Sequence, residues 1–110
     1  MEIEELLDFI KQEHTRLLNL YNVQDKNQLK HPITIKIMEE VGELAQEILA
    51  QDSLQRDDKL AKNSPDNNKE KVANELVDVL ITTLILAENT GVDIKSSIKK
   101  AIEKRKLRNY

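Results

Sequence analysis

Hydrophobic residues recur every three or four positions over most of this chain, and this spacing predicts helices. The first such segment covers residues 2–22, where the apolar positions follow the i, i+3, i+4, i+7 rule of an amphipathic helix. These positions are Ile3, Leu6, Leu7, Ile10, Leu17, Leu18 and Tyr21. One face of this helix is therefore expected to pack on the rest of the protein.

A second helix is predicted from about residue 35 to residue 50. Pro32 disfavours helical backbone at the preceding residue, and the Thr34 side chain can cap the free amides of the following turn. The core positions of this helix are Ile37, Val41, Leu44, Ala45 and Ile48. Residues 52–66 are polar and have no period, which indicates a mobile connection and a candidate lid.

A third helix is predicted from Asn67 to Gly91, and a fourth begins after Asp93. Asn67 and Glu70 have the spacing of a capping box, and glycine favours the position just beyond a helix end. The fourth helix carries Ile94, Ile98, Ile102 and Leu107. This pattern predicts an all-α, four-helix bundle-like fold in a single domain, residues 1–110.

Composition narrows the classes of protein that fit. The chain has no cysteine, which excludes disulfides, thiolate metal sites and a cysteine nucleophile, and suits the cytoplasm. Its acidic start does not resemble a signal peptide, and the longest apolar stretch, residues 76–87, is too short to span a bilayer. A net charge of -3, with only the last segment locally basic and without interleaved aromatic residues, argues against a nucleic-acid partner.

Two acidic pairs with the same spacing are the chemically informative feature. Glu40 and Glu43 lie on the second predicted helix, and Glu75 and Asp78 lie on the third. Residues three apart share a helix face, so antiparallel packing would bring the four carboxylates together. An all-oxygen ligand set is the one that Mg²⁺ or Mn²⁺ prefers. Lys36 and Lys71 fall in the same strips and are predicted to bind substrate.

The segments MEEVGEL, NELVDVL, TGVDI and EKRKLR resemble the MazG-like all-α NTP pyrophosphatase superfamily over residues 33–108. That family has E-E-x-x-E on one helix and E-x-x-D on the next. The resemblance implies that Glu40, Glu43, Glu75 and Asp78 bind Mg²⁺ and that Glu39 assists the attacking water, which makes Glu39, Glu40 and Glu43 the catalytic acids. It also implies hydrolysis of a nucleoside triphosphate to the monophosphate and pyrophosphate, for example in clearing non-standard nucleotides.

Two parts of the sequence depart from the family pattern. Where relatives carry Lys, Asn and Arg as phosphate contacts, this chain has Ala101, Arg105 and Arg108. Only Arg108 matches directly, and it is predicted to bind substrate; Lys100, Lys104 and Arg105 are predicted to supply the missing charge. Many relatives also place an aromatic residue near the base, where this chain has Thr82. The base and the sugar therefore stay open.

Two other functions also involve acidic residues on helices. A ferritin-like di-iron site needs E-x-x-H on two helices, which neither His14 nor His31 provides, and His14 is expected at the surface. A non-catalytic helical interaction module, with the acids as surface charge, is the alternative that stays open. Because the third helix is so apolar, we expect a homodimer or homotetramer in either case.

Overall fold

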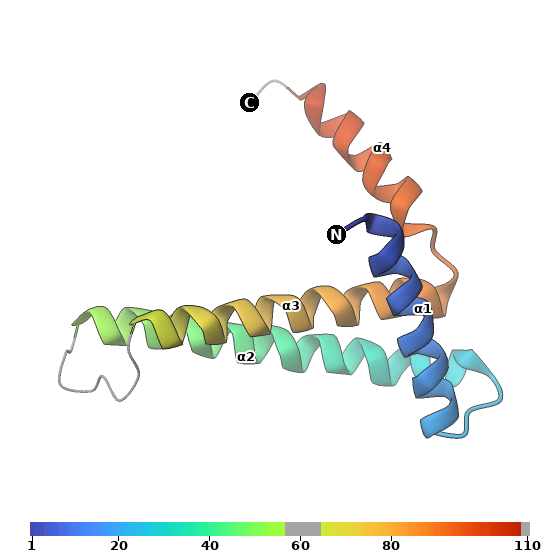
Figure 1. Ribbon diagram of the computed structural model, residues 1–110, viewed down its shortest axis with the longest axis horizontal. Helices are drawn as coiled ribbons and strands as arrows, with labels where there is room; N and C mark the ends of the chain where they lie inside the picture. The colour runs from blue at the N-terminus through green and yellow to red at the C-terminus, as the bar shows by residue number, and fades with distance from the viewer. Residues whose placement is uncertain (57–64, 109–110) are drawn as a thin grey trace. The chain divides into compact units, whose positions relative to one another are not determined.

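The computed structural model describes residues 1–56 and 65–108, except for the side chains of residues 53–56 and 65–67. In this part of the chain the regular elements are four α-helices and a 3-10 turn, in the order α1 (Ile3–Leu20), η1 (Lys26–Leu29), α2 (Lys30–Arg56), α3 (Pro65–Thr90) and α4 (Ile94–Lys106) (Figure 1). The predicted all-α class with four principal helices is confirmed. The predicted packing into one bundle stays a prediction.

The second helix begins earlier than predicted, and Thr34 is not its cap. The Asp25 side chain accepts a hydrogen bond from the Asn27 amide at 3.0 Å, which starts η1, and η1 leads directly into α2 at Lys30. Pro32 therefore lies in the first turn of α2, where no helical partner exists for the amide that proline lacks. The predicted start of this helix was wrong because the 3-10 turn η1, which leads into the helix before Pro32, was not predicted.

The second helix also ends later than predicted. It continues to Arg56 through residues that favour helix, instead of stopping at Ala50. The third helix begins at Pro65 instead of Asn67, consistent with the preference of proline for a first turn. Residues 57–64, the centre of the predicted lid, lie outside the described residues.

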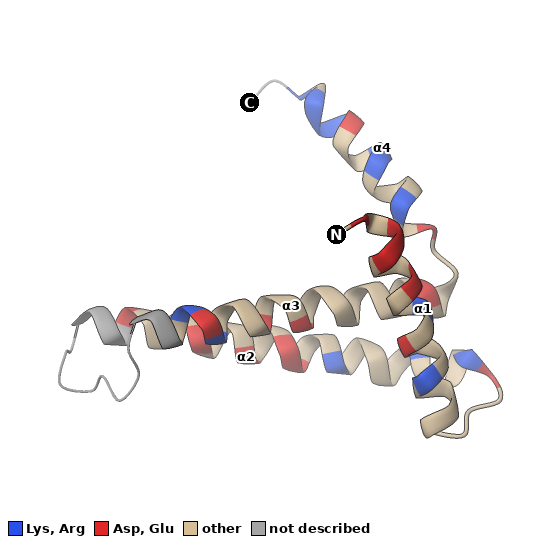
Figure 2. Cartoon of the chain, viewed as in Figure 1, with Lys and Arg blue, Asp and Glu red and all other residues tan. Residues whose placement is uncertain are grey.

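The ends of α3 and α4 agree with the sequence. Gly91 follows α3 with a φ of 73°, and the Val92 amide donates to the Ala87 carbonyl at 2.9 Å, as in a Schellman motif. Asp93 caps α4 by accepting from the Ser96 amide at 3.1 Å. Basic residues lie along α4, as Figure 2 shows, and Lys104, Arg105 and Lys106 lie in its last turn, where the helix dipole favours them.

The described chain divides into two compact units. Unit 1 contains Met1–Pro32 and Leu84–Tyr110, and unit 2 contains Ile33–Thr83. The buried apolar residues of unit 1 are Ile10, Leu29, Leu84, Ile85 and Ala87. Within this unit the His14 Nε2 atom lies 2.8 Å from the Asn89 Oδ1 atom, which connects α1 to the end of α3.

Unit 2 is an antiparallel pair of helices, the α2 and α3 segments that lie side by side in Figure 1. On each helix, the residues that face the other helix form an inward row. The residues of this row are spaced alternately three and four positions apart, as in coiled-coil packing. On α2 this row is Ile33, Ile37, Glu40, Leu44, Glu47 and Gln51, and on α3 it is Asn68, Val72, Glu75, Val79 and Thr82. Acids and an amide thus occupy positions where a helix pair normally carries apolar side chains.

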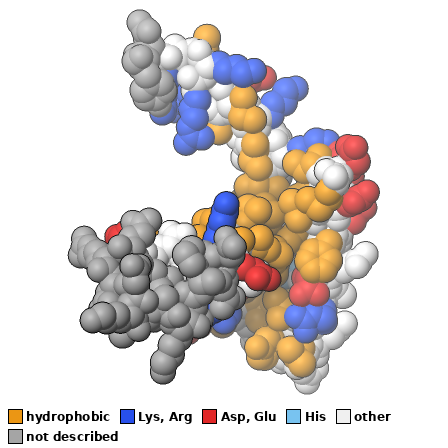
Figure 3. All heavy atoms as spheres, turned by 60° about the vertical axis from the view of Figure 1, so that its left-hand side comes forward, with side chains coloured by type: hydrophobic (Ala, Val, Ile, Leu, Met, Phe, Trp, Pro, Cys, Tyr) orange, Lys and Arg blue, Asp and Glu red, His pale blue; other side chains and the backbone are white. Residues whose placement is uncertain are grey.

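Large apolar side chains remain exposed on unit 2. They are Ile35, Met38, Val41, Ile48 and Leu49 on α2, and Leu76, Val77 and Leu80 on α3. Hydrophobic side chains are also visible at the surface in the view of Figure 3. None of the helices in the described chain combines the length and the apolar character needed to cross a membrane.

Replacement of the two glycines by alanine should have opposite effects. A Cβ atom at either position would meet nothing within 4 Å, so only backbone conformation separates them. Gly91→Ala places a side chain in the left-handed region and should lower the free energy of unfolding by about 1–2 kcal/mol. Gly42→Ala, inside α2, should raise it by about 1 kcal/mol. Urea unfolding measures both, and a stabilising Gly91→Ala would contradict the Schellman end.

Candidate metal centre

Three of the predicted acids converge in unit 2. Glu40 and Glu43 project from α2 and Glu75 projects from α3, and each offers a carboxylate oxygen within 4.8 Å of the others. The red segments of Figure 2 at the middle of both helices mark this region. Antiparallel packing of the two helices therefore brings these three carboxylates together, as their spacing in the sequence predicts.

A buried amide fixes the alignment of the two helices beside the acids. The Asn68 Nδ2 atom donates to the Glu47 backbone carbonyl at 3.5 Å and to the Glu47 Oε2 atom at 3.4 Å. Glu47 lies two turns after Glu40, and Asn68 lies two turns before Glu75, so the contact has the same antiparallel register as the acidic group. Asn68 thus helps to hold Glu40 opposite Glu75.

The acidic group carries charge that the protein offsets only in part. Glu40 is only 6% exposed, and the Oε2 atoms of Glu40 and Glu75 are both buried without a hydrogen-bond partner. Desolvation raises the pKa of Glu75, as do the charge of Glu43, a hydrogen bond to Glu43, and the charges of Glu40 and Asp78. The raised pKa therefore reflects burial first and the crowding of negative charge around Glu75 second.

Lys36 provides the one counter-charge that contacts the group among the described residues. Its Nζ atom lies 3.1 Å from the Glu40 Oε1 atom and 3.7 Å from the Glu39 Oε2 atom. The hydrogen bond to Glu40, followed by the charge of Glu40, raises the pKa of Lys36. The ammonium group therefore stays protonated and neutralises one of the three acids.

The group fits a hard divalent cation. Its donors are all carboxylate oxygens, and two of them are buried without any partner, which is costly unless a cation is bound. Glu40, Glu43 and Glu75 would hold such an ion, with water or substrate oxygens completing its coordination. Mg²⁺ or Mn²⁺ suits these donors best.

The family-model comparison agrees with this geometry. The model of the MazG-like family matches residues 33–110. This chain belongs to the MazG-like family. The match begins where unit 2 begins and includes both helices of the metal centre. No curated protein and no solved structure matches the sequence.

Two other acids expected at this MazG-like site lie outside the convergent group. Asp78 is exposed and does not join the three acids, although its charge contributes to the raised pKa of Glu75. Glu39 is also exposed and pairs with Lys36. Metal binding by Asp78 and assistance to water by Glu39 stay predictions.

The predicted phosphate contacts are divided between the two units. Lys36 and Lys71 lie in unit 2 with the acids, and each precedes a glutamate of the group by four residues. Lys104, Arg105 and Arg108 lie in unit 1, on α4 and just after it. Their contact with phosphate stays a prediction for this MazG-like protein.

Sequence reasoning missed two buried polar pairs. A cap is predicted at Asn67, and no role is predicted for Asn68. Its spacing of seven residues from Glu75 nevertheless puts Asn68 on the same inward row. His14, expected at the surface, is buried against Asn89. The buried Asn89 Nδ2 atom has no partner. No sequence signal identifies that contact, because it joins residues 75 positions apart.

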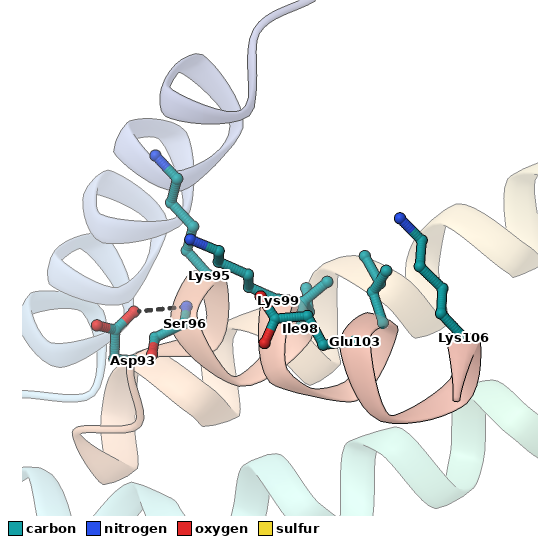
Figure 4. A pocket seen from close by; sticks show the side chains of 8 residues that line it. Asp93, Lys95, Ser96, Ile98, Lys99, Glu103 and Lys106 are labelled. Carbon is teal, nitrogen blue, oxygen red and sulfur yellow. Dashed lines mark hydrogen bonds between the residues drawn. The ribbon is translucent and has the colours of Figure 1, made fainter. Parts of the chain in front are cut away.

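A groove in unit 1 is a poor candidate for the reaction site. Its lining includes Lys95, Ile98, Lys99 and Ile102, and every lining residue comes from α4 or its cap, Asp93 (Figure 4). A groove in the surface of one helix cannot surround a substrate. The metal centre of unit 2 is therefore the stronger site.

The raised pKa of Glu75 predicts a pH effect on stability. Without metal, Glu75 holds its proton more tightly in the folded chain than in the unfolded chain, where its pKa is about 4.3. Its contribution to stability is complete below that value and is lost as pH rises through the folded pKa. Glu75→Gln keeps a neutral side chain, so its stability relative to wild type should increase as pH rises.

Urea unfolding in EDTA between about pH 4 and pH 8 measures this difference. Glu70→Gln is the matched control, because Glu70 is an exposed acid on the same helix. A constant difference between Glu75→Gln and wild type across this range would contradict the prediction.

Proposed function

We propose that this protein hydrolyses nucleoside or deoxynucleoside triphosphates between the α- and β-phosphates in a reaction that requires Mg²⁺. The products are the nucleoside monophosphate and pyrophosphate. The observation that carries this proposal is the convergence of Glu40, Glu43 and Glu75 in a chain of the MazG-like family, whose membership points to nucleotide pyrophosphatase-type activity. Clearance of unwanted nucleotides is a suitable role for such an enzyme.

The residues of unit 2 suit phosphate chemistry that needs no covalent nucleophile. Glu40, Glu43 and Glu75 would hold the divalent ion, and Asp78 is the proposed fourth acid. Bound Mg²⁺ supplies charge neutralisation on the phosphates and a lower pKa for water. Glu39 accepts the proton of the attacking water. Lys36 and Lys71, each four residues before a glutamate of the group, receive phosphate oxygens. Such positioning and charge stabilisation account for most of phosphoryl-transfer catalysis.

The activity test is incubation with a panel of nucleoside and deoxynucleoside triphosphates, with and without Mg²⁺, followed by separation of the products. We expect monophosphate and pyrophosphate in equal amounts, and only with the metal. Single Glu→Gln replacements at positions 40, 43 and 75 should lower kcat/KM by at least about 100-fold, because each removes a ligand charge. Glu70→Gln should retain activity.

Two results would contradict the proposal. Diphosphate with orthophosphate would indicate cleavage of a different bond. An absence of turnover across the panel, with no effect of Mg²⁺ on melting relative to NaCl of equal ionic strength, would favour the interaction module instead.

We also propose that a second copy of this chain covers the apolar face of unit 2. On each helix the exposed apolar residues lie to one side of the inward row, and the acids lie to the other. Because the helices are antiparallel, both apolar arcs fall on the same face of the pair. This face carries the exposed apolar residues Met38, Val41, Leu76 and Leu80.

A copy of the same face is a suitable occupant. It is equally long and carries the same exposed apolar residues, so two copies would bury apolar area against each other. The heptad-like spacing of the rows is also the spacing of helix bundles. The metal centre would stay accessible, because Glu43 and Asp78 border the opposite face. We therefore propose a homodimer, or a homotetramer made of two such dimers.

Leu80→Glu should weaken this association. Leu80 is 52% exposed in the single chain, so its replacement should leave the fold intact. Burial of a leucine contributes about 1.5–3 kcal/mol, so the dimer Kd should rise at least about tenfold. Sedimentation equilibrium measures this change. Asn74→Glu is the control, because it places the same charge on the acidic side of α3, and a monomeric wild type would refute the proposed dimer.

A further inference from the structure

Two lysines occupy equivalent positions in the metal centre but make different contacts. Lys36 precedes Glu40 by four residues on α2, and Lys71 precedes Glu75 by four residues on α3. Lys36 forms an ion pair with Glu40 at 3.1 Å. No ion pair of Lys71 is found within the described residues, where Lys71 is half-buried. Both helices thus have a lysine four residues before a glutamate, but among the described residues the ion pair is found only for Lys36 and Glu40.

We propose that Lys36 is a positioning residue that orients Glu40 toward the metal. Its ammonium group holds the Oε1 atom of Glu40, while the Oε2 atom is buried and has no partner. A glutamate side chain has three rotatable bonds, and fixing one oxygen restricts the place of the other. Carboxylate ligands in metal sites commonly have such an outer partner. This inference rests on the metal centre of the proposed function.

The contacts of Lys36 argue against the opposite role, a tethered cation in the place of the metal. Such a cation would contact all three acids. Lys36 instead pairs with Glu40 and with Glu39, which lies outside the convergent group, and its side chain remains 54% exposed. The described residues show no ion pair from Lys36 to Glu43 or Glu75. Lys36 therefore lies beside the group, on the side of Glu39.

Removal of the lysine distinguishes orientation from simple repulsion, because the two effects have opposite signs. A positive charge near the site repels a divalent ion, so its loss alone would strengthen metal binding. Loss of an orienting partner weakens it, typically by 10- to 100-fold, that is by about one to two powers of ten. The sign of the change thus identifies the role of Lys36.

The experiment is isothermal titration of the metal-free protein with MnCl₂ in the absence of nucleotide. We expect Lys36→Met to raise the Kd for Mn²⁺ at least about tenfold. Lys36→Arg, which can still contact Glu40, should bind nearly as well as wild type. Lys71→Met is the matched control, since it removes the same charge at the equivalent position, and should leave the Kd unchanged or lower it.

The outcomes separate this inference from the proposed function. If wild type does not bind Mn²⁺, the metal centre itself is refuted. If wild type binds and Lys36→Met binds equally or more tightly, only the role of Lys36 is refuted. Equal weakening in Lys71→Met would also refute it, because the effect would not depend on the Glu40 contact. Circular dichroism checks that each variant folds, and Lys36→Gln provides a second uncharged variant.

Discussion

Three carboxylates from two helices share a space in which their oxygens lie within 4.8 Å, and the repulsion among them governs the rest of the site. Such a group forms only if α2 and α3 are antiparallel and in one register. Apolar residues on the inward rows provide the packing, and Asn68 adds a polar contact that a shifted register would break. The hydrophobic pattern forms the helix pair, and the buried amide makes its alignment specific.

The acidic group lowers the stability of the metal-free fold. Glu40 and Glu75 take inward positions that an aliphatic residue would fill more favourably, and each leaves a buried oxygen without a partner. Lys36 neutralises part of this charge from the solvent side. Local instability of this kind is expected where residues are retained for binding, since a ligand that binds only the folded state returns the lost stability.

The sequence predicted the parts of this structure that depend on spacing along one helix. The E-x-x-E step placed Glu40 and Glu43 on one side, and the glycine and aspartate signals at Gly91 and Asp93 marked real helix ends. It could not predict that Asp78 lies outside the convergent group, because that depends on how two helices rotate against each other. The buried contact of His14 with Asn89 likewise depends on tertiary packing alone.

The exposed apolar face and the acidic group of unit 2 use the same two helices, so the proposed association of two copies would bear on the metal centre. The inward residues Glu40 and Glu75 lie between the apolar arc and the acidic arc of their helices. Any change in packing on the apolar face alters the separation and rotation of α2 and α3, and therefore the distance between the two carboxylates. Metal coordination tolerates errors of only about 0.2 Å in ligand distance. A fixed separation and rotation of α2 and α3 is thus a physical requirement of the proposed site.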